Sequence, residues 1–140
     1  MLLGEFSQRI DAKNRVTLPK RYRPQFADGV VVTKGLDGCL FVFDRAGFER
    51  FVDAQLARLD SFSRETRRLE RYLYAGATET ELDAQGRVML TAPLIEHAGL
   101  GRDIVVAGLR DRLEIWDAEA WVRQDAEGGD IEDAVERLAR

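Results

Sequence analysis

Two aspartate–arginine pairs are the side chains in this sequence that are best suited to form a specific binding site. Asp11 precedes Arg15, and Asp83 precedes Arg87, with the same spacing in each case. An aspartate at the start of a tight turn can accept a backbone N–H two residues further on. An arginine guanidinium can bind a carboxylate, a phosphate or the edge of a guanine through two hydrogen bonds. The pairs therefore predict an ion pair that holds a turn in shape, an anion-binding surface, or both.

The two aspartates leave another chemistry open. Asp11 and Asp83 could meet at a symmetry axis, where paired carboxylates bind Mg²⁺ or transfer protons. The arginine that follows each aspartate favours neutralised pairs instead, so we expect no metal and no cofactor. We expect the aspartates to pin hairpins, because an exposed ion pair contributes only about 0–1 kcal/mol and acts mainly through geometry.

Both pairs belong to an internal repeat. Residues 10–18 (IDAKNRVTL) align with residues 82–90 (LDAQGRVML). A second block, residues 35–44, aligns in the same order with residues 108–117. Two blocks in the same order and with nearly the same offset indicate that the chain is a tandem duplication.

Short apolar runs around a polar turn predict the strands of each repeat. The expected strands are Glu5–Ile10, Val16–Leu18, Val30–Thr33 and Leu40–Phe43, then Ile104–Ala107 and Leu113–Trp116 in the second repeat. Asn14 and Gly86 hold the same turn position, and both residue types tolerate a positive φ angle. A left-handed residue is therefore expected in each turn.

Helices are expected after the second strand pair of each repeat. Asp44 and Asp117 are the expected N-caps. The apolar residues expected on these helices are Phe48, Phe51, Val52 and Leu59 in the first and Trp121 and Val122 in the second. Ser63–Tyr74 predicts a further helix, with Leu69, Tyr72 and Leu73 as its apolar stripe. After Gly128 and Gly129, a last helix carries Ile131, Val135 and Leu138.

These elements divide the chain into four segments. Residues 1–60 form the first repeat with its helix (core 5–47), residues 61–75 a connecting helix, residues 76–127 the second repeat with its helix (core 76–119), and residues 128–140 an acidic C-terminal helix. Either repeat alone would have a marginal core. We therefore expect the repeats to form one unit about a pseudo-twofold axis, with exposed apolar helix faces left for oligomer contacts.

Charge is unevenly distributed along the chain. The formal net charge is −4. Residues 1–24 carry six bases and two acids, whereas residues 117–140 carry eight acids and three bases. The two ends are either solvated surfaces of opposite sign or a basic face for an anionic partner separated from an acidic tail.

Several function classes find no support in the sequence. No apolar run approaches the roughly 20 residues that span a bilayer, and no signal-peptide pattern begins the chain, so we expect no membrane partner. The single cysteine, Cys39, and the single histidine, His97, cannot build a Cys/His metal site. No nucleophile elbow, P-loop or dinucleotide-binding pattern occurs, so we do not expect an enzyme. A cytoplasmic location fits the lone cysteine.

The segments that carry a family resemblance are MLLGEFSQRIDAKNRVTLPKRYR, TKGLDGCLFVF, ELDAQGRVML and AGLGRDIVVAGLRDRLEIWDAEAW. With the doubled D-x-x-x-R motif, they resemble the MraZ family of bacterial DNA-binding proteins, which are tandem-repeat relatives of the AbrB/SpoVT-type proteins. The resemblance implies an α+β fold, a swapped-hairpin β-barrel with flanking α-helices. It also implies a homo-oligomeric ring, an octamer or a dodecamer, that binds double-stranded DNA in the nucleoid and regulates the division and cell-wall gene cluster.

We expect the DNA contacts to come mainly from the first repeat. The candidate DNA-binding residues are Arg15, Lys13, Lys20, Arg21, Arg9 and Arg87. The family often shows a proline and a basic residue after the second motif, where this chain has Thr91-Ala92-Pro93. The arginines of the middle helix, Arg64, Arg67, Arg68 and Arg71, alternate with acids and indicate a solvated or intersubunit face.

The expected function is that of a sequence-specific transcription regulator, most simply a repressor that also acts on its own promoter. Several weak hairpin contacts on repeated short DNA elements would add up in a ring. The alternative is an antitoxin-like or other assembly module that uses the same barrel without promoter specificity.

Overall fold

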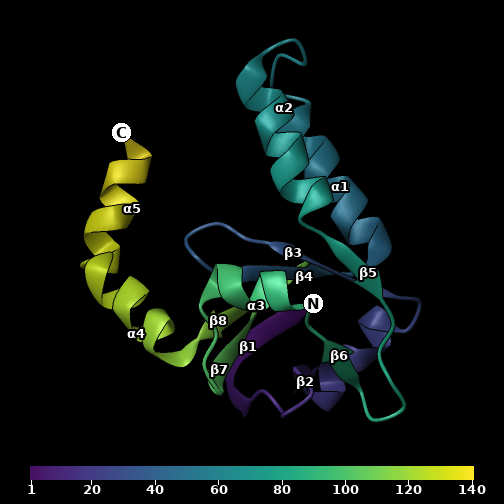
Figure 1. The fold of residues 1–140 in the computed structure, drawn as a ribbon. Coiled ribbons are helices and arrows are strands. Elements are labelled where there is room, and N and C mark those ends of the chain that lie inside the picture. Colours follow the sequence, from purple (N-terminus) through teal and green to yellow (C-terminus); the bar gives the residue numbers. More distant parts are fainter.

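The structure is a computed structural model of residues 1–140, in which two similar series of elements follow one another (Figure 1). The strands are β1 Leu2–Arg9, β2 Arg15–Thr17, β3 Val30–Lys34, β4 Leu40–Phe43, β5 Thr78–Thr80, β6 Arg87–Met89, β7 Asp103–Arg110 and β8 Leu113–Asp117. The α-helices are α1 Arg45–Leu56, α2 Arg64–Glu70, α3 Ala92–Ala98, α4 Ala118–Glu127 and α5 Ile131–Ala139. A 3₁₀-helix, η1, covers Lys20–Phe26, and a π-helical turn, η2, covers Arg71–Ala75.

The two repeats meet in a short antiparallel ribbon formed by β2 and β6. Val16 pairs with Val88, which is its own repeat equivalent, while Arg15 pairs with Met89 and Thr17 with Arg87. The backbone bonds beyond the strands repeat the pattern, because Leu18 N donates to Gly86 O and Leu90 N to Asn14 O. The expected pseudo-twofold axis therefore passes through the valine pair.

The larger sheet shows that the repeats exchange strands. Its order is β1-β7-β8-β4-β3-β5. β1 pairs with β7 of the second repeat, β5 pairs with β3 of the first, and the equivalent strands β4 and β8 pair at the centre. This exchange confirms the expected α+β swapped-hairpin fold with internal symmetry.

The central strands are buried on both faces, which explains their continuous apolar runs. Val30 and Val32 point into one core, and Val31 between them points into another. The first core lies between the six-stranded sheet and the β2–β6 ribbon, and the second lies under α1, η2 and α4. β3, β4, β7 and β8 match or extend the expected strands, whereas β1 begins earlier than expected, at Leu2.

The expected N-cap of α1 is confirmed in position but forms no side-chain cap, and one residue expected on this helix lies outside it. Asp44 stands at the N-cap of α1, but its side chain accepts no capping hydrogen bond. Its Oδ1 is buried over Gly47 in the first turn of the helix and forms no hydrogen bond there. Leu59 lies outside α1, which ends at Leu56, and is exposed.

The remaining helix starts follow the sequence. Asp117 accepts a hydrogen bond from Ala120 N at the start of α4, as expected. Ser63 caps α2 by accepting from Thr66 N, and the expected helix Ser63–Tyr74 is divided between α2 and η2. Leu73 of its stripe is buried in the second core, with Leu69 and Tyr72 packed beside it.

Candidate nucleic-acid interface

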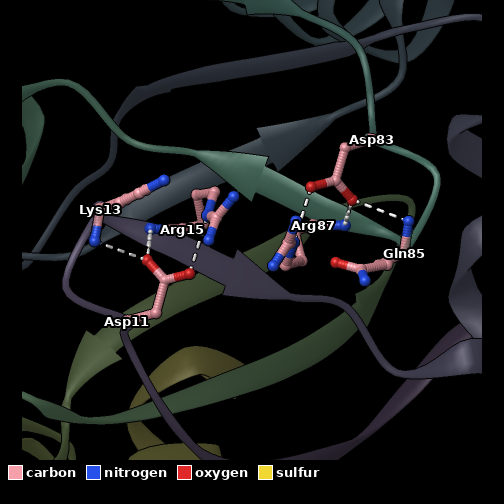
Figure 2. Close-up of polar contacts among 6 residues, drawn as sticks. All are labelled: Asp11, Lys13, Arg15, Asp83, Gln85 and Arg87. Atoms are coloured by element: carbon pink, nitrogen blue, oxygen red, sulfur yellow. Dashed lines mark hydrogen bonds and ion pairs between the residues drawn. The ribbon is translucent and has the colours of Figure 1, made fainter.

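The first hairpin turn is held by the carboxylate of Asp11. Its Oδ1 accepts from Lys13 N at 2.9 Å and from Arg15 N at 2.8 Å. Its Oδ2 accepts from Arg15 Nε at 2.8 Å, so the carboxylate binds both the turn and the guanidinium (Figure 2). Asn14 has a φ of 61°, as its position in the turn predicts. The hydrogen bonds of Asp11 therefore hold the turn together and orient the Arg15 side chain.

The second hairpin has the same geometry. Asp83 Oδ1 accepts from Gln85 N and from Arg87 N, both at 2.9 Å. Asp83 Oδ2 accepts from Arg87 Nε at 2.6 Å, and Gly86 has a φ of 73°. Each turn therefore contains an aspartate–arginine ion pair and a left-handed residue, which is the geometry that a hairpin-pinning role requires.

Both aspartate carboxyls have a pKa below the ordinary value. The backbone N–H of Arg15 holds the pKa of the Asp11 carboxyl below its ordinary value, and the bonds from the Arg15 side chain and Lys13 N act in the same direction. The backbone N–H of Arg87 lowers the pKa of Asp83 in the same way. Each hairpin therefore keeps its ion pair at neutral pH.

The ribbon directs its two arginines to one face. Side chains alternate along a strand, and Val16 and Val88 are completely buried in the first core. The outer face therefore carries Arg15 beside Met89 at one end, and Arg87 beside Thr17 at the other. In Figure 2 the two guanidinium groups lie over the ribbon, between the two aspartates. The fold thus gathers both arginines on the outer face of the ribbon, where their side chains are 24% and 25% exposed.

Arg23 is a further basic residue at this surface, and it was not among the sequence candidates. Its side chain lies over the Gly86 turn, where an added Cβ would be in hard contact with Arg23 Nε. Arg23 Nε also donates to Leu18 O at 3.0 Å. The first repeat therefore contributes a basic side chain, Arg23, to the second hairpin. This hairpin has no lysine of its own, because Gln85 stands where the first hairpin has Lys13. No local sequence signal marks Arg23, because its position results from the strand exchange, which brings the segment after β2 beside the other repeat's turn.

The other candidate bases are spread around the ribbon. Lys13 is exposed at the first turn, and Lys20 is exposed at the start of η1. Arg9 pairs with Asp103 at 3.4 Å, at the end of β1, and both side chains are largely exposed. Arg21 instead packs on the N-terminal strand, with its guanidinium 4.8 Å from the centre of the Phe6 ring. Its Nη2 also donates to Leu3 O at 3.3 Å, so Arg21 is tied to β1.

Comparison with known proteins gives one consistent result. The sequence model of the family described as "MraZ protein, putative antitoxin-like" matches the chain twice, over residues 1–72 and 73–139. The chain belongs to the MraZ family. A protein of Symbiobacterium thermophilum named Transcriptional regulator MraZ is 44% identical over 129 residues, covering 92% of this chain and 93% of its own. A protein of Clostridium acetobutylicum with the same name is 34% identical over 139 residues, covering 99% and 97%.

Each of the two MraZ matches contains one complete Asp–Arg hairpin. Within this MraZ fold, the two carboxylates do not form a shared site, because each aspartate binds its own turn and its own arginine. No cluster of three metal-binding side chains occurs in the structure. None of its helices has the length and apolar character that crossing a membrane requires.

The cysteine, the histidine and the large aromatic side chains of the MraZ chain are packed against other parts of the fold. Cys39 is fully buried, and burial raises the pKa of its thiol. His97 lies in the last turn of α3, and its Nε2 is 3.2 Å from Tyr72 Oη. Phe43, Phe48 and Trp116 are buried in the second core, and Trp121 packs beside them, so these aromatic side chains belong to the core.

Proposed function

We propose that this MraZ-family protein is a sequence-specific DNA-binding transcription regulator that inserts the outer face of its β2–β6 ribbon into the major groove. The observation that carries this proposal is the pair of arginines, Arg15 and Arg87, each fixed by an aspartate on the outer face of one ribbon. Its relatives in Symbiobacterium thermophilum and Clostridium acetobutylicum are named transcriptional regulators, in agreement with this role.

The dimensions and chemistry of the ribbon suit a DNA groove. The major groove of B-DNA is about 12 Å wide and admits a two-stranded β-ribbon. Asp11 and Asp83 engage the Nε atoms of the two arginines, which leaves the terminal nitrogens for base edges or phosphates. A guanidinium that is already held in place loses less side-chain entropy on binding. The aspartates thus act indirectly, by orienting the arginines.

The lysine and arginine side chains around the ribbon are suited to bind the phosphate backbone of DNA. Lys13, Lys20 and Arg9 are exposed near the ribbon ends, and Arg23 lies beside the second turn. We assign them to phosphate contacts, which fix the register of a protein on the duplex without reading sequence. Arg21 remains a weaker candidate, because it is tied to β1.

Assembly would turn one weak contact into a specific complex. In our proposal the protein forms a homo-oligomeric ring, an octamer or a dodecamer, whose ribbons bind repeated short elements. Linked binding events become intramolecular, which raises the overall affinity without new contacts. The target would be DNA upstream of its own gene, at the head of the division and cell-wall gene cluster, with repression as the outcome. This function needs no cofactor and no catalysis, and it places the protein in the cytoplasm on the nucleoid.

The test is footprinting on the DNA upstream of the gene that encodes this chain. We expect protection of several short repeated elements by the wild type, and loss of that protection with Arg15→Ala/Arg87→Ala. Protection that is equal on a scrambled fragment would contradict sequence-specific binding. Unchanged protection with the double variant would contradict the assignment of the ribbon.

The family description favours one competing function. Its wording, "antitoxin-like", agrees with a module that neutralises a small protein through the same barrel. Purification of the tagged protein from its native cell separates the two possibilities. A stoichiometric small protein that remains bound in high salt would favour the antitoxin-like role, whereas specific DNA protection by the purified chain alone favours regulation.

A further inference from the structure

The C-terminal helix α5 has an apolar face that nothing in its own chain covers. Ile131, Val135 and Leu138 share one side of the helix and are 74%, 57% and 87% exposed. No residue of α5 is buried. Helices shorter than about 12–15 residues are marginal in water without packing. A nine-residue helix with an exposed apolar stripe therefore requires a partner surface.

The first repeat shows what cover the second repeat lacks. α1–α2 and α4–α5 are the helix pairs that follow equivalent strands, β4 and β8. α2 and η2 fold back beside α1, and Leu73 is buried in the second core. α5 instead continues away from the sheet beyond Gly128 and Gly129, and Figure 1 shows it standing apart from α1 and α2. The helix pair of the second repeat thus leaves its last apolar face open.

The charge of this region selects the partner. We call residues 117–140 the arm; it carries eight acids and three bases. The open groove at the base of α4, about 710 Å³ in volume, extends the acidic surface with Glu5, Glu114 and Asp125. Two arms packed together would bring like charges close, which is unfavourable. The arm therefore fits a basic partner with some exposed apolar surface.

The helical hairpin α1–α2 of this same sequence has those properties. Its connecting loop exposes Leu59 and Phe62, and Phe62 is 88% exposed. Between residues 58 and 71 it carries five arginines and three acids. All five arginines are exposed: Arg58, Arg64, Arg67, Arg68 and Arg71. The exposed surface of this hairpin is therefore complementary in charge to the arm.

We propose that the arm of one copy packs against the α1–α2 helical hairpin of the next copy. The two surfaces are different, so the contact is heterologous, and such contacts generate closed rings or open filaments. The apolar stripe of α5 is covered by the partner's helical hairpin, while arm acids face hairpin arginines. The inference rests on the self-assembly in the proposed function, but not on which residues contact DNA.

Charge reversal on each side tests this interface. The arm-reversed variant is Glu132→Arg/Glu136→Arg, and the hairpin-reversed variant is Arg64→Glu/Arg68→Glu; all four residues are exposed. We expect light scattering after size exclusion to show a multimer for the wild type and a shift towards single chains for each variant. A control reversal outside both surfaces, Glu81→Arg/Glu96→Arg, should keep the wild-type mass. Far-UV circular dichroism checks that every variant is folded.

Two further measurements identify the pairing. Mixing the two reversed variants should restore the multimer, because each reversed arm then meets a reversed helical hairpin, and combining both reversals in one chain should restore it as well. Ile131→Ser/Leu138→Ser should weaken assembly without altering charge.

Wild-type mass for both reversed variants would overturn the interface, and arm–arm packing would leave the hairpin-reversed variant unaffected. A hairpin-reversed variant that keeps its mass but loses DNA would assign the arginines to DNA instead. A wild type that is monomeric would overturn the self-assembly and this interface together, whereas a multimer that fails to bind DNA would overturn only the proposed DNA function.

Discussion

Val16 lies opposite Val88 at the centre of the β2–β6 ribbon, and both side chains are completely buried. They are equivalent residues of the two repeats, so the pair lies on the pseudo-twofold axis. On the other face of the same ribbon, Arg15 and Arg87 point outward from the neighbouring positions. The packing that holds the repeats together therefore also positions the two arginines.

We expect Val16→Ala and Val88→Ala each to destabilise the fold by about 2 kcal/mol, because each removes buried methyl groups and leaves a cavity. The two effects should not simply add, since the residues are in contact. Urea denaturation followed by circular dichroism measures both values. Leu36→Ala is the control, because Leu36 is exposed and lies outside both proposed contact surfaces, and its effect should stay within about 0.5 kcal/mol. An effect that small for Val16→Ala would contradict the central role of the pair.

Arg15→Ala should reduce affinity for the specific DNA about 5- to 150-fold, because one arginine contact to a base is worth about 1–3 kcal/mol. Lys13→Ala should weaken specific and non-specific binding alike and lower the salt slope by about 1. Gel-shift titrations at several fixed salt concentrations measure both effects. Arg110→Ala, which removes an exposed arginine at the end of β7 outside the ribbon and both proposed contact surfaces, is the matched control. Equal losses for Arg110→Ala and Arg15→Ala would indicate a general charge effect.

Acid should weaken the fold through the two pinned aspartates. Their pKa values in the folded state lie below the ordinary carboxyl value of 3.8. Each ionised carboxylate therefore contributes its whole stabilising effect at pH values above 3.8. The contribution is lost as pH falls through the lowered native pKa values. We expect Asp11→Asn/Asp83→Asn to be less stable than the wild type at neutral pH. Denaturation curves between about pH 7 and pH 2 should show that difference shrink in acid, and a difference that stays constant with pH would contradict the ionic role.

Much of the fold follows from local patterns in the sequence. Val30–Thr33 and Leu40–Phe43 predict strands because a short, continuous apolar run suits a strand in the core. In the structure their side chains are buried on both faces of the sheet. Asp11 and Asn14 predict the turn because an aspartate side chain can bond to nearby backbone N–H groups and asparagine tolerates a positive φ angle. The repeated blocks predict internal symmetry. These features depend on neighbours in the chain, which is why the sequence is informative.

The long-range features could not be derived in the same way. Nothing local indicates that β1 pairs with β7, and only the family resemblance implied the exchange. The position of Arg23 over Gly86 follows from that exchange, so it could not be predicted either. Asp44 shows another limit, because a residue suited to an N-cap can stand at that position and still form no side-chain hydrogen bond.

Gly86 gives the most specific test of how the repeats interlock. Gly86→Ala should destabilise the fold for two reasons: a non-glycine residue at a φ of 73° is strained, and its Cβ would collide with the Arg23 side chain. Gly99→Ala is the matched control, since Gly99 has a φ of 58° but open space around it, and it should cost only the backbone strain of about 1–2 kcal/mol. In an Arg23→Ala background the collision disappears, so Gly86→Ala should then cost no more than Gly99→Ala. Thermal unfolding of the four variants measures this difference. If the excess cost of Gly86→Ala persisted without the Arg23 side chain, the contact between the first repeat and the second hairpin would not be its cause.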